Sequence, residues 1–282
     1  MTIEHVSDTA RWVAVYRAME TERPDAIFRD PYARRLAGDK GEAIVRVMKH
    51  GAHAAWAMIV RTAVMDELLL RHIRDDGVDC VLNLAAGLDT RPFRLVLPST
   101  LHWVDVDFAD VLDYKWELLK TERASCDYER APVDLADAAA RRTLFARIGR
   151  EHQRVFVIAE GLLIYLARED VTGLATDLHA QPPFRWWLID IASPQLLKWM
   201  SHSWGKRAAA GNAPFRFAPD EGTAFFAPLG WRELEYRSNW LESQRLNRQM
   251  RGAWLWKLLG MLYSRRRDAA ARMAGCVLLG NG

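Results

Sequence analysis

The sequence contains few cysteines, little net charge and no long apolar run. Three of the 282 residues are cysteines, at positions 80, 126 and 276, and they show no paired or metal-ligand spacing. We therefore expect reduced thiols in a cytoplasmic protein and no metal site. The 39 basic and 36 acidic residues leave a net charge of +3, which by itself does not indicate a nucleic-acid partner.

Membrane and secretion signals are also missing. The best apolar stretches, 54–60 and 254–263, are far shorter than the roughly 20 residues that a bilayer-spanning helix needs. The first twelve residues lack the basic start and apolar run of a signal peptide. No repeat, low-complexity tract or Gly/Ser-rich linker marks a domain boundary. With 50% hydrophobic residues, the chain is long enough for one large domain or a core with a small accessory lobe.

Hydrophobic periodicity predicts helices first and then strands alternating with helices. The first helices are expected over 10–20, 33–49 and 58–73. Short apolar runs predict strands over 79–85, 101–107, 154–160 and 184–191, with a weaker candidate over 132–135. Helical patterns separate them over 111–120, 136–150 and 168–179. This alternation predicts βαβ units, and hence a parallel sheet covered on both faces.

The last third departs from that alternation. Residues 193–210 are expected to be helical, with Ser193 as N-cap and Pro194 at the first helical position. Residues 212–230 are rich in Pro, Gly and Phe and predict a long loop or lid. Closing strands are expected over 231–236 and 275–279, with a helix over 241–272. We divide the chain accordingly into an N-terminal helical segment (1–75), a Rossmann-like core (76–192), a cap or lid (193–230) and a closing segment (231–282).

The most informative stretch is VLNLAAGLDTRPFRL, residues 81–95. The small residues Ala85, Ala86 and Gly87 allow a sharp turn after a strand and leave room for a ligand. Asp107 follows Gly87 by twenty residues, at the end of the next strand, where an acid can accept hydrogen bonds from a ribose. An ordinary turn and a solvent-facing Asp form the competing interpretation. The third glycine of a dinucleotide fingerprint is replaced by Thr90, which favours S-adenosylmethionine (SAM) over NAD.

Three segments together resemble the leucine carboxyl methyltransferase superfamily: VLNLAAGLDTRPFRL, WVDVDFADVLDYK and VIAEGLLIYL. The resemblance continues over 9–38 and 213–231, so it covers nearly the whole chain. Within the superfamily the chain most resembles bacterial small-molecule O-methyltransferases associated with polyketide-type products. The resemblance implies an α/β class I SAM-dependent methyltransferase fold. That fold has a Rossmann-like, seven-stranded, mostly parallel sheet with N-terminal helices and a helical cap.

Matched by position, the resemblance implies how the nucleoside half of SAM is held. Asp107 matches the ribose-binding acid, whereas Asp105 matches the position two residues before it. Asp134 and Leu135 match a pair that flanks the adenine. A helix N-cap is an equally ordinary role for Asp134.

The resemblance also implies how the methionine half is held. Ala85 and Gly87 match a turn that lies against it, although the family usually has glycine at the position of Ala85. Glu160 matches an acid near the SAM ammonium group, and Arg61 matches an arginine that pairs with the SAM carboxylate. Arg61 alone resembles a surface helix residue, whereas a carboxylate that ends an apolar strand must find partners.

The expected reaction is SAM-dependent methylation of a carboxylate or hydroxyl on a small, aromatic or apolar molecule. An ionised carboxylate needs no general base, whereas an alcohol or phenol does. The weak candidates for a catalytic or pocket-lining residue are Tyr165 and His202. Of the twelve Trp residues, eight lie at or beyond position 186, and we expect Trp199 and Trp204 to lie over the acceptor.

Other functions compete with this prediction. Because the first glycine of the turn is replaced, the chain can instead be a SAM-binding partner without catalysis. A methyltransferase acting on a protein C-terminal carboxylate is a further alternative. Residues 232–272 contain ten Lys and Arg against four Asp and Glu, as well as three Trp residues. That composition suits a nucleic-acid surface, but a solvated helix face is the more ordinary interpretation.

Overall fold

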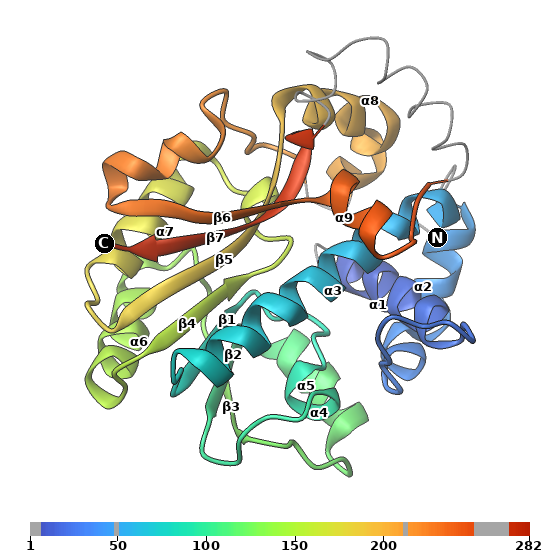
Figure 1. Cartoon of the computed structure of the whole chain (residues 1–282). Helices are drawn as coiled ribbons and strands as arrows, with labels where there is room; N and C mark the ends of the chain where they lie inside the picture. The colour runs from blue at the N-terminus through green and yellow to red at the C-terminus, as the bar shows by residue number, and fades with distance from the viewer. Residues whose placement is uncertain (1–6, 48–50, 211–213, 251–270) are drawn as a thin grey trace.

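The computed structural model describes residues 7–47, 51–210, 214–250 and 271–282, and their side chains except at 7–9, 47, 51–54 and 203–210. One sheet of seven strands runs through it in the order β3-β2-β1-β4-β5-β7-β6 (Figure 1). β7 is antiparallel to both of its neighbours, and the other pairs are parallel. The strands are β1 (Cys80–Leu84), β2 (His102–Asp107), β3 (Asp127–Pro132), β4 (Val155–Ala159), β5 (Phe184–Ala192), β6 (Trp231–Ser238) and β7 (Ala274–Asn281). The predicted mostly parallel sheet is confirmed.

Helices precede the sheet and alternate with its strands. They are α1 (Ser7–Thr21), α2 (Ala33–Val47), α3 (Gly51–Asp75), α4 (Arg91–Arg94), α5 (Ala109–Leu119), α6 (Ala138–Glu151), α7 (Arg168–His179), α8 (Pro194–Ala210) and α9 (Asn239–Arg245). Two 3-10 helices, η1 (Leu163–Tyr165) and η2 (Gly222–Leu229), lie among them. Ser193 begins α8 as predicted, because its hydroxyl accepts a hydrogen bond from the Leu196 amide at 3.3 Å. In the described part of the chain, no helix has the length and apolar character to cross a bilayer.

The parallel strands are buried on both faces, which explains their continuous apolar sequence. Every residue of β1 and of β4 is buried. One face of the sheet packs against α6 and α7, and the other packs against α3. Trp187 lies in the first of these layers, while its neighbour Trp186 packs into the second. The two neighbours therefore face opposite sides of the sheet, as adjacent residues of a strand do.

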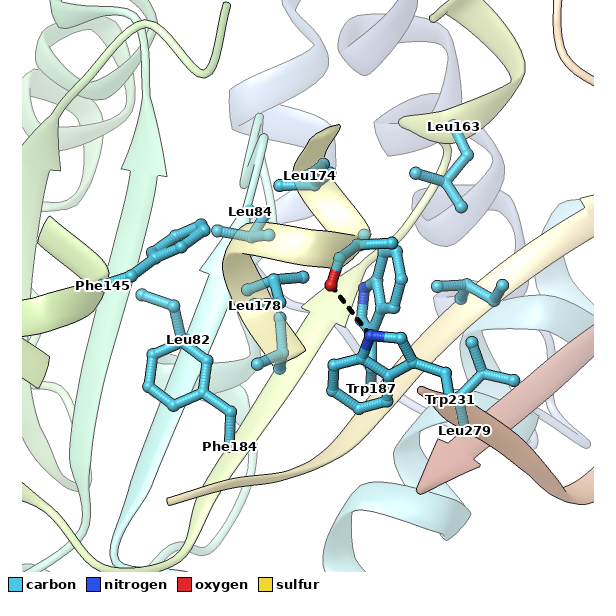
Figure 2. Close-up of a cluster of buried hydrophobic side chains, with 14 of the residues drawn as sticks. Leu82, Leu84, Phe145, Leu163, Leu174, Leu178, Phe184, Trp187, Trp231 and Leu279 are labelled. Carbon is cyan, nitrogen blue, oxygen red and sulfur yellow. Dashed lines mark hydrogen bonds between the residues drawn. The ribbon is translucent and has the colours of Figure 1, made fainter. Parts of the chain in front are cut away.

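The Phe-rich segment before β6 belongs to the core and does not form an open lid. Phe217, Phe225 and Phe226 are buried, and Phe226 meets Trp187 edge to face at 5.5 Å between ring centroids. Trp231 packs beside Trp187 and donates its indole N–H to the Ala175 carbonyl of α7 at 3.0 Å (Figure 2). The expectation of a lid was wrong for these aromatic rings because they cover the apolar end of the sheet, where η2 and β6 meet α7.

Two predicted elements are displaced. The weak strand expected over 132–135 ends at Pro132 and occupies 127–132, where DYERAP forms the polar edge strand β3. Only one side of an edge strand has a neighbour, so its sequence lacks the apolar run that marks a central strand. Of the helix expected over 241–272, α9 ends at Arg245, and residues 251–270 lie outside the described residues.

Candidate functional site

The turn after β1 has two residues in the left-handed region, at the edge where the parallel strands end. Gly87 has a φ of +49°, and a side chain there would meet the Ala10 Cβ at 3.2 Å. Ala85 has a φ of +50° although it carries a Cβ, a conformation that costs an L-residue roughly 1 kcal/mol. The Ala86 amide donates to the Val106 carbonyl at 3.0 Å and fixes the turn against β2.

Asp107 lies directly against this turn. One carboxylate oxygen accepts a hydrogen bond from the Gly87 amide at 2.7 Å, and the other accepts one from the Phe108 amide at 2.8 Å. Burial raises the pKa of Asp107, and the two amide hydrogen bonds offset only part of that rise. The side chain is thus held in one orientation with lone pairs left on both oxygens.

Asp105, two residues earlier on the same strand, is buried and forms its contacts inside the protein. Its carboxylate is completely buried and pairs with Lys115 at 2.6 Å. It also accepts hydrogen bonds from Asn83, Trp103 and Tyr128 at 2.8–2.9 Å. A carboxylate with this many internal partners is a structural group, so the two acids have different surroundings.

Arg61 links the carboxyl ends of two strands. It projects from α3, and its Nε donates to Glu160 at 3.0 Å, while its Nη1 donates to Asp190 at 2.9 Å. Glu160 follows β4, and Asp190 lies near the end of β5. Asp190 also accepts from the Gly161 amide at 2.6 Å, and Gly161 has a φ of +66° with the Arg61 guanidinium beside it. Arg61 is 7% exposed, which excludes the competing interpretation of a surface helix residue.

A second arginine supports Glu160 from the other side. Arg91 approaches the free oxygen of Glu160 at 2.8 Å and pairs with Asp89 and Asp66, both at 2.6 Å. Arg94 pairs with Asp66 as well. Burial alone would raise the pKa of Glu160, but the charges of Arg91 and Arg61 outweigh it and leave that pKa below its ordinary value. Arg91 thus pairs with its near neighbour Asp89 as well as with acids that are distant in the sequence.

The pair predicted to flank an adenine follows β3. Asp134 is exposed, and its side chain accepts a hydrogen bond from the Ala136 amide at 2.9 Å. It does not cap α6, because that role belongs to Asp137, whose carboxylate accepts from the Ala139 and Ala140 amides. Leu135 is half-buried against the core. Asp134 therefore remains available at the same edge of the sheet as Asp107.

The two candidates for an acceptor-side residue lie on η1 and α8. Tyr165 ends η1 and packs beside Phe215 at 5.7 Å between ring centroids. His202 is exposed on α8, as is Trp199 at 56%. The side chain of Trp204 lies outside the described residues.

Arginines of the basic segment 232–272 pair with acids in the described structure. Arg237 and Arg245 both pair with Glu242. Arg248 forms a buried ion pair with Glu20 of α1, and Arg272 pairs with Glu233. These four arginines fasten α9 and β6 to their surroundings, which disfavours the nucleic-acid interpretation for the described part of this segment.

Comparison with known proteins decides the family. The family model for leucine carboxyl methyltransferase matches residues 10–179. The chain is 32% identical over 239 residues to a Streptomyces avermitilis protein named an S-adenosyl-L-methionine-dependent methyltransferase, covering 79% of this chain and 82% of that protein. A Streptomyces coelicolor protein of the same name is 32% identical over 242 residues with the same coverage. The chain belongs to the leucine carboxyl methyltransferase family.

This leucine carboxyl methyltransferase family member is a SAM-dependent methyltransferase, and SAM is its cofactor. Solved structures agree on the fold. A DUF574 family protein from Streptomyces avermitilis has a TM-score of 0.61 at 14% identity and covers 95% of this chain and 97% of its own. A Thermobifida fusca protein named as a methyltransferase has a TM-score of 0.55 at 13% identity, covering 95% and 94%. Both likenesses show the class I fold alone.

The structure also contains site residues that the sequence interpretation did not assign. Asp190 is an acid near the end of the apolar strand β5, two residues before Ala192, so a signal similar to that of Glu160 was present at FRWWLIDIA. Arg17 donates to the Leu88 carbonyl at 2.6 Å and to Asp30 at 2.8 Å. Asp30 in turn accepts from the Thr90 hydroxyl at 2.7 Å, which ties α1 to the turn after β1. No local pattern indicates this second network, because its members are far apart in the sequence.

Proposed function

We propose that this methyltransferase transfers the methyl group of SAM to an oxygen of a small apolar or aromatic molecule. The observation that carries the proposal is the alternation of charge at the strand ends. Arg61 lies between Glu160 and Asp190, and the Ala85–Gly87 turn and Asp107 end the neighbouring strands at the same edge. A zwitterionic amino acid joined to a ribose is complementary to this arrangement.

The residues present fit SAM. Asp107 has unused lone pairs on both oxygens, which suits the two ribose hydroxyls. The Arg61 guanidinium would bind the carboxylate of SAM, and Glu160 its ammonium group. Asp134 would accept from the exocyclic amine of the adenine, with Leu135 against the ring. Ala85 and Gly87 would line the methionine moiety, with Gly87 leaving room for it.

When bound, SAM supplies a methyl group on a positively charged sulfur that is already an activated leaving group. The protein then has to orient the acceptor and exclude water. Glu160 and Asp89 are poor bases, because neighbouring arginine charges overcome the effect of burial and keep both pKa values low. An acceptor carboxylate, ionised at neutral pH, needs no base. For a hydroxyl acceptor, Tyr165 and His202 remain the candidates to position or deprotonate it.

We assign the cap over the acceptor to α8, residues 194–210, with the exposed Trp199 as its aromatic contact. The remaining boundaries, 1–75, 76–192 and 231–282, stay predictions. The free thiols Cys80, Cys126 and Cys276 favour a reducing compartment, and we place the reaction in the cytoplasm. The cap assignment makes Trp199→Ala a direct test. It should raise the KM for the acceptor while leaving the SAM Kd unchanged.

A transfer assay with methyl-labelled SAM tests the function. Aryl and alkyl carboxylic acids are offered beside phenols of matched size, and the products are treated with mild base. Label released by base identifies a methyl ester, whereas retained label identifies an ether. Rates that are flat above pH 6 indicate a carboxylate, and rates that rise with pH indicate a phenol.

The control enzyme is Asp107→Ala, which should lose transfer in parallel with SAM affinity. Tight SAM binding without transfer to any acceptor would support a non-catalytic SAM-binding partner instead. Transfer to peptides with a free C-terminal carboxylate but not to small acids would support the protein-directed alternative. Transfer only to nitrogen or sulfur acceptors would refute O-methylation.

A further inference from the structure

The opposite edge of the sheet carries a second cluster of groups with ligating atoms. Cys80 begins β1, His102 begins β2, and His152 directly follows α6. Cys80 and His102 are register partners on neighbouring parallel strands, so their side chains share one face of the sheet. The Cys80 sulfur and one ring nitrogen of each histidine all lie within 4.8 Å of one another. The cluster is at the amino ends of the strands, whereas the SAM turn follows their carboxyl ends.

The two imidazole rings lie within hydrogen-bonding distance of each other. The Nδ1 of His102 lies 2.9 Å from the Nε2 of His152. The second nitrogen of His102, Nε2, lies 3.1 Å from a carboxylate oxygen of Glu129. Glu129 is itself fixed by Arg147 at 2.5 Å. A carboxylate on the outer nitrogen sets the tautomer and the ring orientation of a ligating histidine, so His102 has both a directed inner nitrogen and an outer support.

Cys80 is the third group of the cluster, and its side chain is completely buried. A thiol loses its proton on binding a metal ion, so Cys80 would act as a thiolate ligand.

We propose that Cys80, His102 and His152 bind one zinc-class divalent metal ion. One thiolate and two imidazoles are donors that zinc prefers, and they leave a fourth position for water. Binding releases the thiol proton of Cys80 to solvent. The ion would join the starts of two strands to the end of α6, so it would act on stability and not on methyl transfer. The sequence predicted no metal site because His102 and His152 are 50 residues apart.

Cobalt(II) titration of chelator-treated protein tests the proposal, because cobalt reports thiolate ligation by a charge-transfer band in the near ultraviolet. We expect one cobalt ion per chain, displacement by zinc, and a higher Tm with zinc present. Cys80→Ser should abolish the band. Cys126→Ser is the matched control, since this half-buried thiol is no part of the cluster, and it should keep both the band and the affinity.

Two variants that leave Cys80 in place, one of a histidine ligand and one of the carboxylate behind His102, keep the test decisive if Cys80→Ser does not fold. His152→Gln, at a half-buried helix end, should weaken cobalt binding more than tenfold. Glu129→Gln should keep the band but weaken binding by about 10–100-fold, the effect of losing an outer-shell carboxylate. Circular dichroism and SAM binding verify that each variant is folded. The absence of saturable binding, a band that survives Cys80→Ser, or an unchanged affinity in His152→Gln would overturn the proposal. The cluster would then be a hydrogen-bonded imidazole pair beside a buried thiol.

Discussion

Replacing Asp107 by Ala should weaken SAM binding strongly and change the stability of the free protein little. Each of its oxygens already accepts one backbone amide, at 2.7 and 2.8 Å, and has capacity for one ribose hydroxyl. Hydrogen bonds to a charged group contribute about 1.5–3 kcal/mol each. Losing two of them in Asp107→Ala costs about 3 kcal/mol, which is roughly 100-fold in SAM affinity.

The free protein should tolerate this change well. Burial raises the folded-state pKa of Asp107 above its unfolded value. The folded chain therefore holds the proton more tightly, and the ionised carboxylate costs stability at pH 7, a cost that disappears as the pH falls below the folded pKa. Removing the carboxylate removes that cost and offsets the loss of the Gly87 contact. We expect the free energy of unfolding to change by less than about 1 kcal/mol.

Asp105→Ala should give the opposite pattern. It leaves the Lys115 ammonium group buried without its partner, which costs about 3–5 kcal/mol of stability. SAM affinity of the folded fraction should fall less than tenfold. Asp110→Ala, which removes an exposed acid of α5, is the control for net charge and should change neither quantity.

Isothermal titration calorimetry with SAM and urea unfolding measure the two quantities. A SAM affinity of Asp107→Ala within threefold of the wild type would refute the ribose assignment. A greater affinity loss in folded Asp105→Ala than in Asp107→Ala would refute it as well.

Three further predictions follow from the geometry. Ala85→Gly relieves a left-handed alanine and should raise the Tm by about 2–4 °C in scanning fluorimetry; an unchanged or lower Tm would contradict the strain. Arginine charges outweigh burial and lower the pKa of Glu160 in the folded protein. The ionised Glu160 carboxylate therefore contributes stability above its unfolded pKa of about 4.3. This contribution is lost as the pH falls through the lower folded pKa. Urea unfolding between about pH 5 and pH 3 should therefore show a shallower loss of stability in Glu160→Gln than in the wild type, and equal slopes would argue against this coupling. Trp231→Phe removes the hydrogen bond to the Ala175 carbonyl and leaves a void beside Trp187, so chemical denaturation should show a loss of about 2–3 kcal/mol; a loss below about 0.5 kcal/mol would mean that the aromatic cluster repacks.

Local pattern predicted most of the sheet correctly. The runs at 79–85 and 154–160 contain β1 and β4, because a strand buried on both faces must be apolar along its whole length. The polar edge strand β3 was misplaced for the converse reason. The Phe residues over 215–226 were interpreted as a lid because composition does not distinguish an aromatic that lines a pocket from one that fills a core.

Sequence alone determined the family, the parallel sheet, the turn at Ala85–Gly87 and the prediction that Asp107, not Asp105, faces the ligand. These depend on local spacing and on motif matches, which a linear chain displays directly. Tertiary structure decided which charges meet. Arg61 pairs with Glu160, 99 residues away in the sequence, and with Asp190, 129 residues away. His102 contacts His152, which is 50 residues away. Such contacts exist only after the parallel strands align their ends, because the order of strands in the sheet, and not their order in the chain, brings the first network together at the carboxyl ends and the second at the amino ends.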